Sequence, residues 1–267
     1  MNKTTIYFLF LLLSLSQIFC PVLASNKKLE QNSVFQVATI GSLALAVYDG
    51  NYDYGSLMKH GNFGVGTFLD LNGEMVAIDG NFYQIESSGK LKSVNAKQIV
   101  PFAEVTFFKP TIHQTLANIS NYEELGNKLS NTFPNTNIPY AIRIDGTFKA
   151  LKLRSLRKQK KPYPPLAQAS EEQAIFDLQN VNGSIVGFWF PQYWAGIAVP
   201  GYHLHFVTQD RTTGGHVLEI NLTKGQVSME PLYQVQVHLP NTKSFAQVNL
   251  SDKELHSSIK KAEGGTQ

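Results

Sequence analysis

The sequence predicts a strand-rich α+β fold made of two related α/β subdomains in tandem, with mixed or antiparallel sheets. Its 267 residues include 20 Gly, 11 Tyr and 17 Phe, a composition typical of strands joined by tight turns. Apolar stretches flank turn pairs such as Asn72-Gly73. Residues 73–78 also resemble residues 215–220, which fits two halves of related architecture.

Composition excludes several classes of protein. Hydrophobic residues make up 43% of the chain and charged residues 16%, against roughly 25% charged in an average soluble domain. A disordered chain has few apolar residues and many charges, so that class is excluded. The formal net charge of +3 is small and evenly spread, so no nucleic-acid partner is expected.

The N-terminal segment has the pattern of an export signal. A positive charge at Lys3 precedes an apolar run at 6–19, and Val22-Leu23-Ala24 offers a small-residue cleavage pattern. The sequence therefore predicts a signal peptide at 1–24, cleaved after Ala24, and a secreted or periplasmic product. The apolar run of about 14 residues is shorter than the roughly 20 that span a bilayer, so no stable membrane span is expected. A membrane anchor and a lipoprotein signal at Cys20 are the alternatives, although bulky Phe19 disfavours the second.

The chain contains one cysteine, Cys20. No internal disulfide can form, and cleavage after Ala24 would remove the only thiol. A cysteine nucleophile is therefore excluded from the mature protein.

The first half, assigned to residues 25–160, contains both helix and strand patterns. Residues 34–49 are apolar and fit either a strand or a short helix. Asn72-Gly73 predicts a hairpin between two strands, and Asp145-Gly146 predicts another. The expected elements are strands at 64–69, 74–78, 97–108, 140–144 and 148–153, and a helix at 121–129.

A basic, proline-rich stretch at 157–165 is the candidate linker, because it cannot continue a helix or a central strand. The second half, residues 161–267, is expected to be rich in strands. Ser251–Glu254 has the form of a capping box that opens a helix running to about Glu263. The expected strands are 174–179, 184–190, 202–208, 215–221 and 232–238.

Three of the seven histidines fall close together in the second half. Because alternate side chains of a strand share a face, His203 and His205 point the same way. The turn-rich segment 210–214 then returns His216 on a neighbouring strand. Three imidazoles with an open fourth position are typical of a catalytic zinc ion, which we expect between the two halves. The alternative is an exposed strand face on which the histidines bind no metal.

These residues carry a specific resemblance. The segment 201–206, followed by Asp210-Arg211 and 214–218, resembles the zinc motif of α-acetolactate decarboxylases. Other motifs of that family recur in order, and the resemblance covers the chain after the signal segment. They are 66–68, 71–74, 79–80, 82–84, 140–142, 146–148, 152–155, 187–189, 191–193 and 196–197. Asn72 stands where the family commonly has Asp.

The resemblance implies roles for individual residues. His203, His205 and His216 would bind Zn²⁺, with Glu263 close to the metal. Glu74, Arg154 and Glu263 would have catalytic roles, and Thr67 and Arg154 would bind the substrate. Without the resemblance, Arg154 would be assigned to the solvated basic stretch and Glu74 to a surface turn.

The resemblance also implies the reaction. A small 2-hydroxy-3-keto acid, 2-acetolactate, would lose CO₂ and give acetoin. Zinc would stabilise the enediolate, Arg154 would orient the carboxylate and Glu74 would transfer a proton. A homodimer is the assembly that we consider for this enzyme.

Two other functions remain open. A three-histidine zinc ion also activates water, so a zinc hydrolase or lyase on another small carbonyl compound is the nearest alternative. A non-catalytic, exported module that binds a metal or a sugar is the second.

Overall fold

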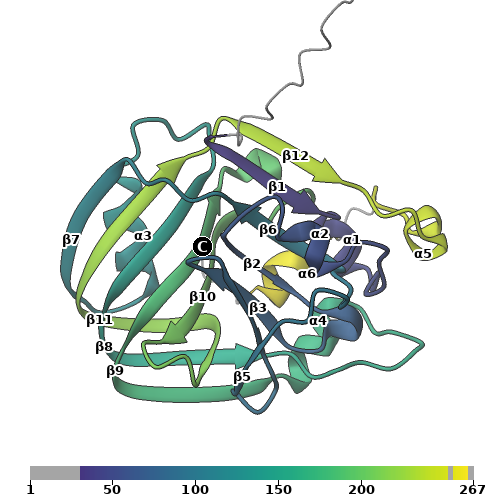
Figure 1. Ribbon diagram of the computed structural model, residues 1–267, viewed down its shortest axis with the longest axis horizontal. Coiled ribbons are helices and arrows are strands. Elements are labelled where there is room, and N and C mark those ends of the chain that lie inside the picture. Colours follow the sequence, from purple (N-terminus) through teal and green to yellow (C-terminus); the bar gives the residue numbers. More distant parts are fainter. Residues whose placement is uncertain (1–30, 252–254, 264–267) are drawn as a thin grey trace, which may run out of the picture.

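The computed structural model describes residues 31–251 and 255–263 of the chain. Two β-sheets pack together, and short helices flank them (Figure 1). The expected signal segment at 1–24, Cys20 included, lies outside the described residues, as do positions 252–254 of the expected capping box. None of the helices described is long and apolar enough to cross a bilayer.

The first sheet has seven strands in the order β12-β1-β6-β2-β3-β4-β5. The pairing of β1 with β12 is parallel, whereas the other neighbours in this sheet are antiparallel. The bounds are β1 Ser33–Val37, β2 Phe63–Thr67, β3 Glu74–Ile78, β4 Asn81–Ile85, β5 Leu91–Ser93, β6 Phe102–Thr106 and β12 Gln234–His238.

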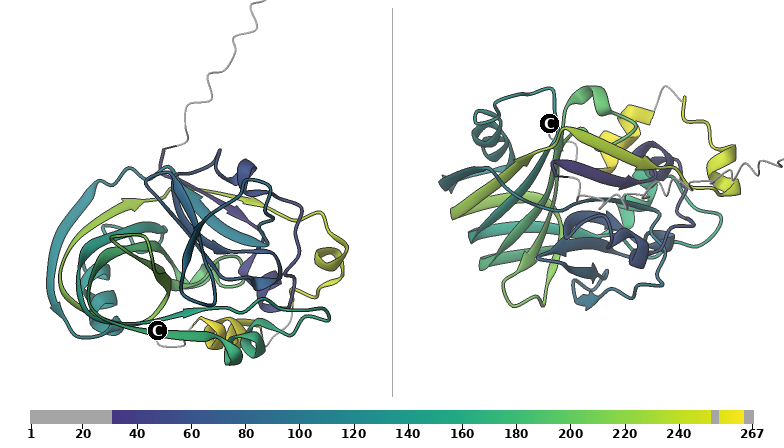
Figure 2. Two further views of the ribbon diagram at one scale, coloured as in Figure 1. Left: turned by 60° about the horizontal axis from the view of Figure 1, so that its bottom comes forward. Right: turned by 45° about the horizontal axis from the view of Figure 1, so that its top comes forward.

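The second sheet has five antiparallel strands in the order β10-β9-β8-β11-β7. Because β10 also pairs with β11, the sheet curls back on itself (Figure 2). The bounds are β7 Ile112–Ile119, β8 Tyr140–Ser155, β9 Ala174–Phe190, β10 Gly201–Thr208 and β11 Gly214–Pro231.

The helices are short. The α-helices are α1 Ile40–Ala44, α2 Tyr54–Leu57, α3 Tyr122–Ser130, α4 Leu166–Ala169, α5 Lys243–Gln247 and α6 Leu255–Ala262. Single 3-10 turns are η1 Leu69–Leu71, η2 Ser170–Glu172 and η3 Gln192–Trp194. The C-terminal helix α6 packs against α1 and α4 through a shared apolar core (Figure 1).

Several predicted elements are confirmed in the first half. The ambiguous stretch 34–49 contains both a strand, β1, and a short helix, α1. The expected helix is α3, whose N-cap Asn121 accepts a hydrogen bond from the backbone N–H of Glu124. Strands β2 and β3 form the expected antiparallel pair. Gly73, with φ of +91°, takes the left-handed conformation that this connection needs.

The predicted hairpin at Asp145-Gly146 is wrong, because β8 runs through both residues without a turn. Gly146 lies between Gly183 of β9 and Gly225 of β11. A Cβ atom at Gly146 would lie 2.3 Å from the carbonyl oxygen of Lys224. The glycine therefore permits a close approach of neighbouring strands and does not mark a turn.

The second half has fewer and longer strands than predicted. The two expected strands at 174–179 and 184–190 are one strand, β9, in which Asn180 has a φ of +51°. The strand expected at 215–221 continues to Pro231 as β11. The other predicted strands are β10 and β12, and the C-terminal helix is α6.

The sheets do not divide at residue 160. Strands β7 and β8 precede that residue and lie in the second sheet, whereas β12 follows it and lies in the first. The basic stretch 157–165 joins β8 to β9, which pair along their length. The division of the chain into halves at 25–160 and 161–267 stays a prediction.

One apolar core joins the two sheets. Phe63 and Val76 of the first sheet pack with Val186, Phe188 and Val207 of the second. This contact fixes the face of β10 against the faces of β3 and β6. It thereby brings polar side chains from both sheets into one buried region.

Candidate metal centre and active site

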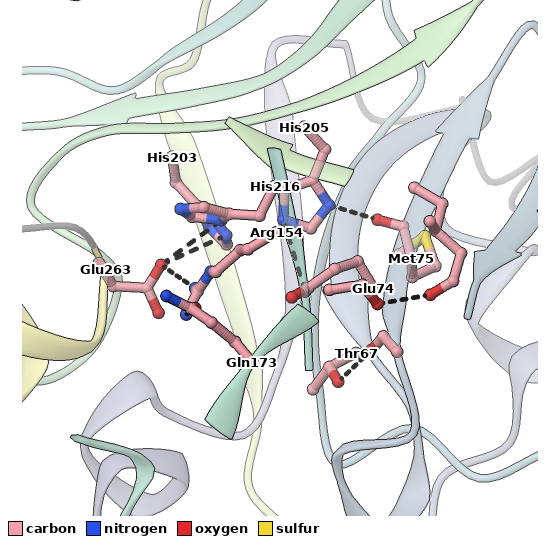
Figure 3. A network of polar contacts seen from close by, with 12 residues as sticks. Thr67, Glu74, Met75, Arg154, Gln173, His203, His205, His216 and Glu263 are labelled. Carbon is pink, nitrogen blue, oxygen red and sulfur yellow. Dashed lines mark hydrogen bonds and ion pairs between the residues drawn. The ribbon is translucent and has the colours of Figure 1, made fainter. Parts of the chain in front are cut away.

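The three predicted histidines form a buried cluster in the second sheet. His205 on β10 lies directly opposite His216 on β11, and His203 lies two residues away on the same face of β10. Their exposed fractions are 5% for His203, 0% for His205 and 3% for His216. One nitrogen of each ring lies within 4.8 Å of the other two (Figure 3). The alternative of an exposed strand face is therefore wrong.

The hydrogen bonds indicate which nitrogens face one another. Nδ1 of His205 lies 2.9 Å from the carbonyl oxygen of Met75, which can only accept, so Nδ1 carries the proton. Nε2 of His205 is left to face Glu74 at 3.8 Å. Nε2 of His203 and Nδ1 of His216 each lie 3.8 Å from Oε2 of Glu263. One nitrogen of each ring therefore faces a shared space that carboxylates border.

Glu74 is the first strand residue of β3 and is 3% exposed. Burial raises its pKa to about 7, although the nearby positive charge of Arg154 opposes the shift. The carboxyl group can therefore hold a proton near neutral pH. Glu74 is a buried site residue and not a surface turn carboxylate.

Arg154 lies on β8 directly opposite His216 and is 2% exposed. Its guanidinium donates to the carbonyl oxygen of Ala262 at 2.7 Å and to Gln173 at 3.3 Å. It also lies 3.4 Å from Glu263 (Figure 3). The basic stretch that follows is largely exposed, but Arg154 is not part of that surface. A guanidinium at the last carbonyl of α6 also favours that end of the helix dipole.

Glu263 directly follows α6 and borders the histidine cluster beside His203 and His216. Its backbone N–H donates to Ile259 at 3.0 Å as the last bond of the helix. The packing of α6 on α1 and α4 therefore holds the carboxylate of Glu263 beside the histidine cluster. The side chain of Glu263 is 9% exposed.

A small cavity joins the predicted residues. It is lined by Thr67, Glu74, Arg154, His203 and Glu263, and its other wall is apolar, from Ile40, Leu43, Phe102, Leu156 and Leu166. The hydroxyl of Thr67 donates to the carbonyl oxygen of Gly73 at 2.7 Å, which holds the β2–β3 connection beside Glu74. The structure thus brings every residue predicted for the site into one region.

The sequence analysis missed three contributors to this region. They are the carboxylate of Glu104 on β6, the carbonyl of Met75 and the amide of Gln173. A signal existed for Glu104, which is the one charged residue in the otherwise apolar or neutral stretch 100–106. A carboxylate in a buried strand calls for a partner.

The charges of the region fit a bound divalent cation. Burial lowers the pKa of His205 and of His216 well below the ordinary value, so both rings are neutral and have a free nitrogen. Burial also disfavours a charge on His203, but Glu104 and Glu263 outweigh it and raise its pKa. The carboxylates of Glu74, Glu104 and Glu263 border the histidine cluster, and one guanidinium, that of Arg154, lies near Glu74 and Glu263. Carboxylates therefore outnumber the guanidinium groups at this cluster, and a bound cation would favour their ionised forms.

A strand-rich α+β fold with a buried three-histidine cluster, carboxylates and a guanidinium around one cavity defines a candidate mononuclear metalloenzyme. Neutral imidazoles suit zinc, copper, iron or nickel.

Comparison with known proteins identifies the family. Residues 34–252 match the model of the alpha-acetolactate decarboxylase family. The chain is 40% identical to the alpha-acetolactate decarboxylase of Bacillus licheniformis, over 90% of this chain and 94% of that one. It is 41% identical to the Methanosarcina mazei protein of the same name, over 86% of this chain and 80% of that one. The chain belongs to the alpha-acetolactate decarboxylase family.

Solved structures show the same fold. The alpha-acetolactate decarboxylase of Bacillus subtilis strain 168 superimposes with a TM-score of 0.85 at 39% identity, covering 87% of this chain and 99% of that one. A Staphylococcus aureus protein described as similar to alpha-acetolactate decarboxylase gives 0.83 at 28% identity, covering 86% of this chain and 100% of that one. The resemblance drawn from the motifs is thus confirmed, and the chain is an enzyme of the carboxy-lyase class.

Proposed function

We propose that this protein is a zinc-dependent decarboxylase that converts 2-acetolactate to acetoin and CO₂. One observation supports this above the others: Arg154 and Glu74 lie at the same buried three-histidine cluster, on different sheets. A carboxylate-binding group, a proton donor and a set of metal ligands are therefore within reach of one small molecule.

The reaction needs charge stabilisation and one proton. The bond between the carboxylate carbon and the hydroxyl-bearing carbon breaks, CO₂ leaves, and the electron pair moves toward the adjacent ketone. The resulting enediolate takes a proton on carbon to become acetoin. When bound, zinc supplies a Lewis acid for the negative charge that develops on the substrate oxygens.

Arg154 is the residue that would hold the substrate carboxylate. A guanidinium matches a carboxylate with two parallel hydrogen bonds. Because its side chain is 2% exposed, little water competes for that contact. In this conformation Nη1 donates to Ala262 and Gln173 and Nη2 lies 3.4 Å from Glu263. Nε is buried and has no hydrogen-bond partner among the described residues, so the Nε edge of the guanidinium is the one left to receive the carboxylate.

Glu74 is the residue that would deliver the proton. Its pKa of about 7 lets the carboxyl group exist in both protonation states near neutral pH, as a general acid must. Proton delivery on one face of the enediolate would set the configuration of the product.

Substrate entry would require local opening. The cavity has a volume of about 20 Å³, which is room for about one water molecule. The end of α6, with Glu263, forms one wall and makes its apolar contacts with short helices. Movement of this segment would admit the substrate without disturbing either sheet.

Export is part of the same proposal. Cleavage after Ala24 would release a secreted or periplasmic enzyme without cysteine. N-terminal sequencing of the protein from its host medium or periplasm would show Ser25 as the first residue. Light scattering of the same sample would show whether the enzyme is a homodimer.

Purified chain supplied with one equivalent of zinc and 2-acetolactate should release acetoin and CO₂ in equal amounts. A chelator should abolish this activity. A panel of other small carbonyl compounds and esters is the control. Turnover of one of those but not of 2-acetolactate would identify the alternative zinc hydrolase or lyase, and turnover of none would favour a non-catalytic module.

A further inference from the structure

Glu104 carries a buried carboxylate that the proposed reaction does not use. It lies on β6 between Gln36 of β1 and Val65 of β2, and its exposed fraction is 0%. Within the described part of the chain, neither of its oxygens has a hydrogen-bond partner at ordinary length. A lone carboxylate in such surroundings costs several kcal/mol. The fold therefore retains a costly group at this position.

The ring of His203 has Glu104 on one side and, on the other, the space that the three histidines share. Nδ1 lies 3.6 Å from Oε2 of Glu104. Nε2, on the other side of the ring, is the atom that faces Glu263. A proton on Nδ1, directed at Glu104, leaves the lone pair of Nε2 free for a metal ion.

The neighbouring ligand has the same arrangement. Nδ1 of His205 faces the carbonyl of Met75, and Nε2 faces the cluster. Met75 lies on β3 and Glu104 on β6, and both strands belong to the first sheet. The first sheet therefore places a hydrogen-bond acceptor at Nδ1 of His203 and another at Nδ1 of His205, both of which lie on the second sheet.

We propose that Glu104 is a positioning residue for the metal centre: it accepts a hydrogen bond from Nδ1 of His203 and so directs Nε2 at the ion. A carboxylate in this position raises the basicity of the ligand as well as fixing its orientation. Removal of such a partner typically weakens metal binding about 10- to 100-fold. This inference rests on the proposed metal centre but not on the identity of the substrate.

Substitution at Glu104 separates this role from a structural one. Glu104→Leu removes a buried charge, so the metal-free protein should melt at an unchanged or higher temperature. Its zinc dissociation constant should nevertheless rise about 10- to 100-fold. Glu104→Gln keeps a hydrogen-bond acceptor, so its zinc dissociation constant should lie between those of the wild type and Glu104→Leu. Zinc affinity is measured by competition with a chromophoric chelator.

Glu230 provides the matched control. It is equally buried, but its carboxylate accepts hydrogen bonds from the backbone N–H groups of Asn32 and Lys109, far from the cluster. Glu230→Leu should lower the melting temperature and leave zinc affinity unchanged. The two variants should thus show opposite patterns.

The outcomes are distinguishable. Zinc affinity of Glu104→Leu within about twofold of the wild type would overturn the inference, because the usual loss is at least about tenfold. Absence of zinc binding by the wild type would overturn the metal centre itself. If the Leu variant does not fold, long-range ¹H–¹⁵N NMR of the zinc-loaded wild type decides: the inference requires His203 protonated on Nδ1, and a proton on Nε2 contradicts it.

Discussion

Arg154 and His216 lie directly opposite each other on the antiparallel strands β8 and β11. His216 is in turn opposite His205 on β10. One row across three strands therefore carries the guanidinium and two of the candidate ligands. Because sheet hydrogen bonds fix that register, the spacing between substrate-binding and metal-binding groups is set by the backbone.

Arg154→Lys should lower kcat/KM for 2-acetolactate by about 100-fold, because an ammonium group cannot make the paired hydrogen bonds of a guanidinium. Steady-state acetoin assays measure this effect. Arg143→Lys is the control, since Arg143 lies on the same strand but pairs with Asp79 and Asp145. Equal losses in the two variants would contradict the assigned role of Arg154.

Glu74→Gln should lower kcat by about 10²- to 10⁴-fold with little change in KM, because an amide cannot donate the acid proton. Glu86→Gln should retain full activity, because Glu86 directly follows the adjacent strand β4 and pairs with Lys92. Zinc content is measured in parallel, so that a kcat loss at full zinc occupancy isolates the proton-transfer step. Full activity of Glu74→Gln would show that another group supplies the proton.

The metal-free protein should show a stability difference between wild type and Glu74→Gln that depends on pH. The pKa of Glu74 is about 7 in the folded protein, against the ordinary value of 4.5 that applies to the unfolded chain. The folded state thus holds a proton that the unfolded state has released, and wild type loses stability as pH rises through this window. As pH rises, the free energy of unfolding of Glu74→Gln relative to the wild type should increase by an amount on the order of 3 kcal/mol. The increase should level off above about pH 7. Urea unfolding with chelator, at several pH values, measures it; a constant difference would contradict the raised pKa.

Ile259→Ala should loosen α6 more than either sheet. Ile259 is 2% exposed and packs in the core that α6 shares with α1 and α4. Loss of such a side chain costs about 2–4 kcal/mol, and this loss should weaken the packing of α6 on α1 and α4. Ala262 and Glu263 would then lose their contacts with Arg154. Hydrogen exchange should accelerate in α6, and kcat/KM should fall by about tenfold or more.

Leu239→Ala, at a position that is 54% exposed, is the control for that variant. It should change neither quantity. Faster exchange throughout both sheets in Ile259→Ala would show that α6 is part of the global fold and not a separately docked segment.

The histidine cluster could be predicted because its geometry is local. Alternation on one strand places His203 and His205 on one face, and the turn-rich segment at 210–214 returns His216 beside them. The grouping of three imidazoles that these short-range rules predict is the one observed.

Other features depend on contacts between distant segments. Gly146 looks like a turn residue from its neighbours, but Gly183 and Gly225 on adjacent strands explain it. Arg154 sits at the start of an exposed basic stretch, and only its register opposite His216 makes it a buried site residue. Local patterns do not contain that information, so the family resemblance was needed for Arg154.

Glu263 illustrates the same limit. Its carboxylate reaches the cluster because α6 packs on α1 and α4, helices that lie far away in the sequence. Glu104 was missed for a related reason: its partner, His203, lies on the other sheet. Packing of the two sheets creates the site, and no single segment encodes it.

Titration of metal-free protein with zinc while acetoin formation is followed tests the central claim most directly. Activity should rise linearly and reach its plateau at one zinc ion per chain, and His216→Ala should stay inactive over the same range. Full activity before zinc is added, in protein shown by elemental analysis to be metal-free, would contradict the account.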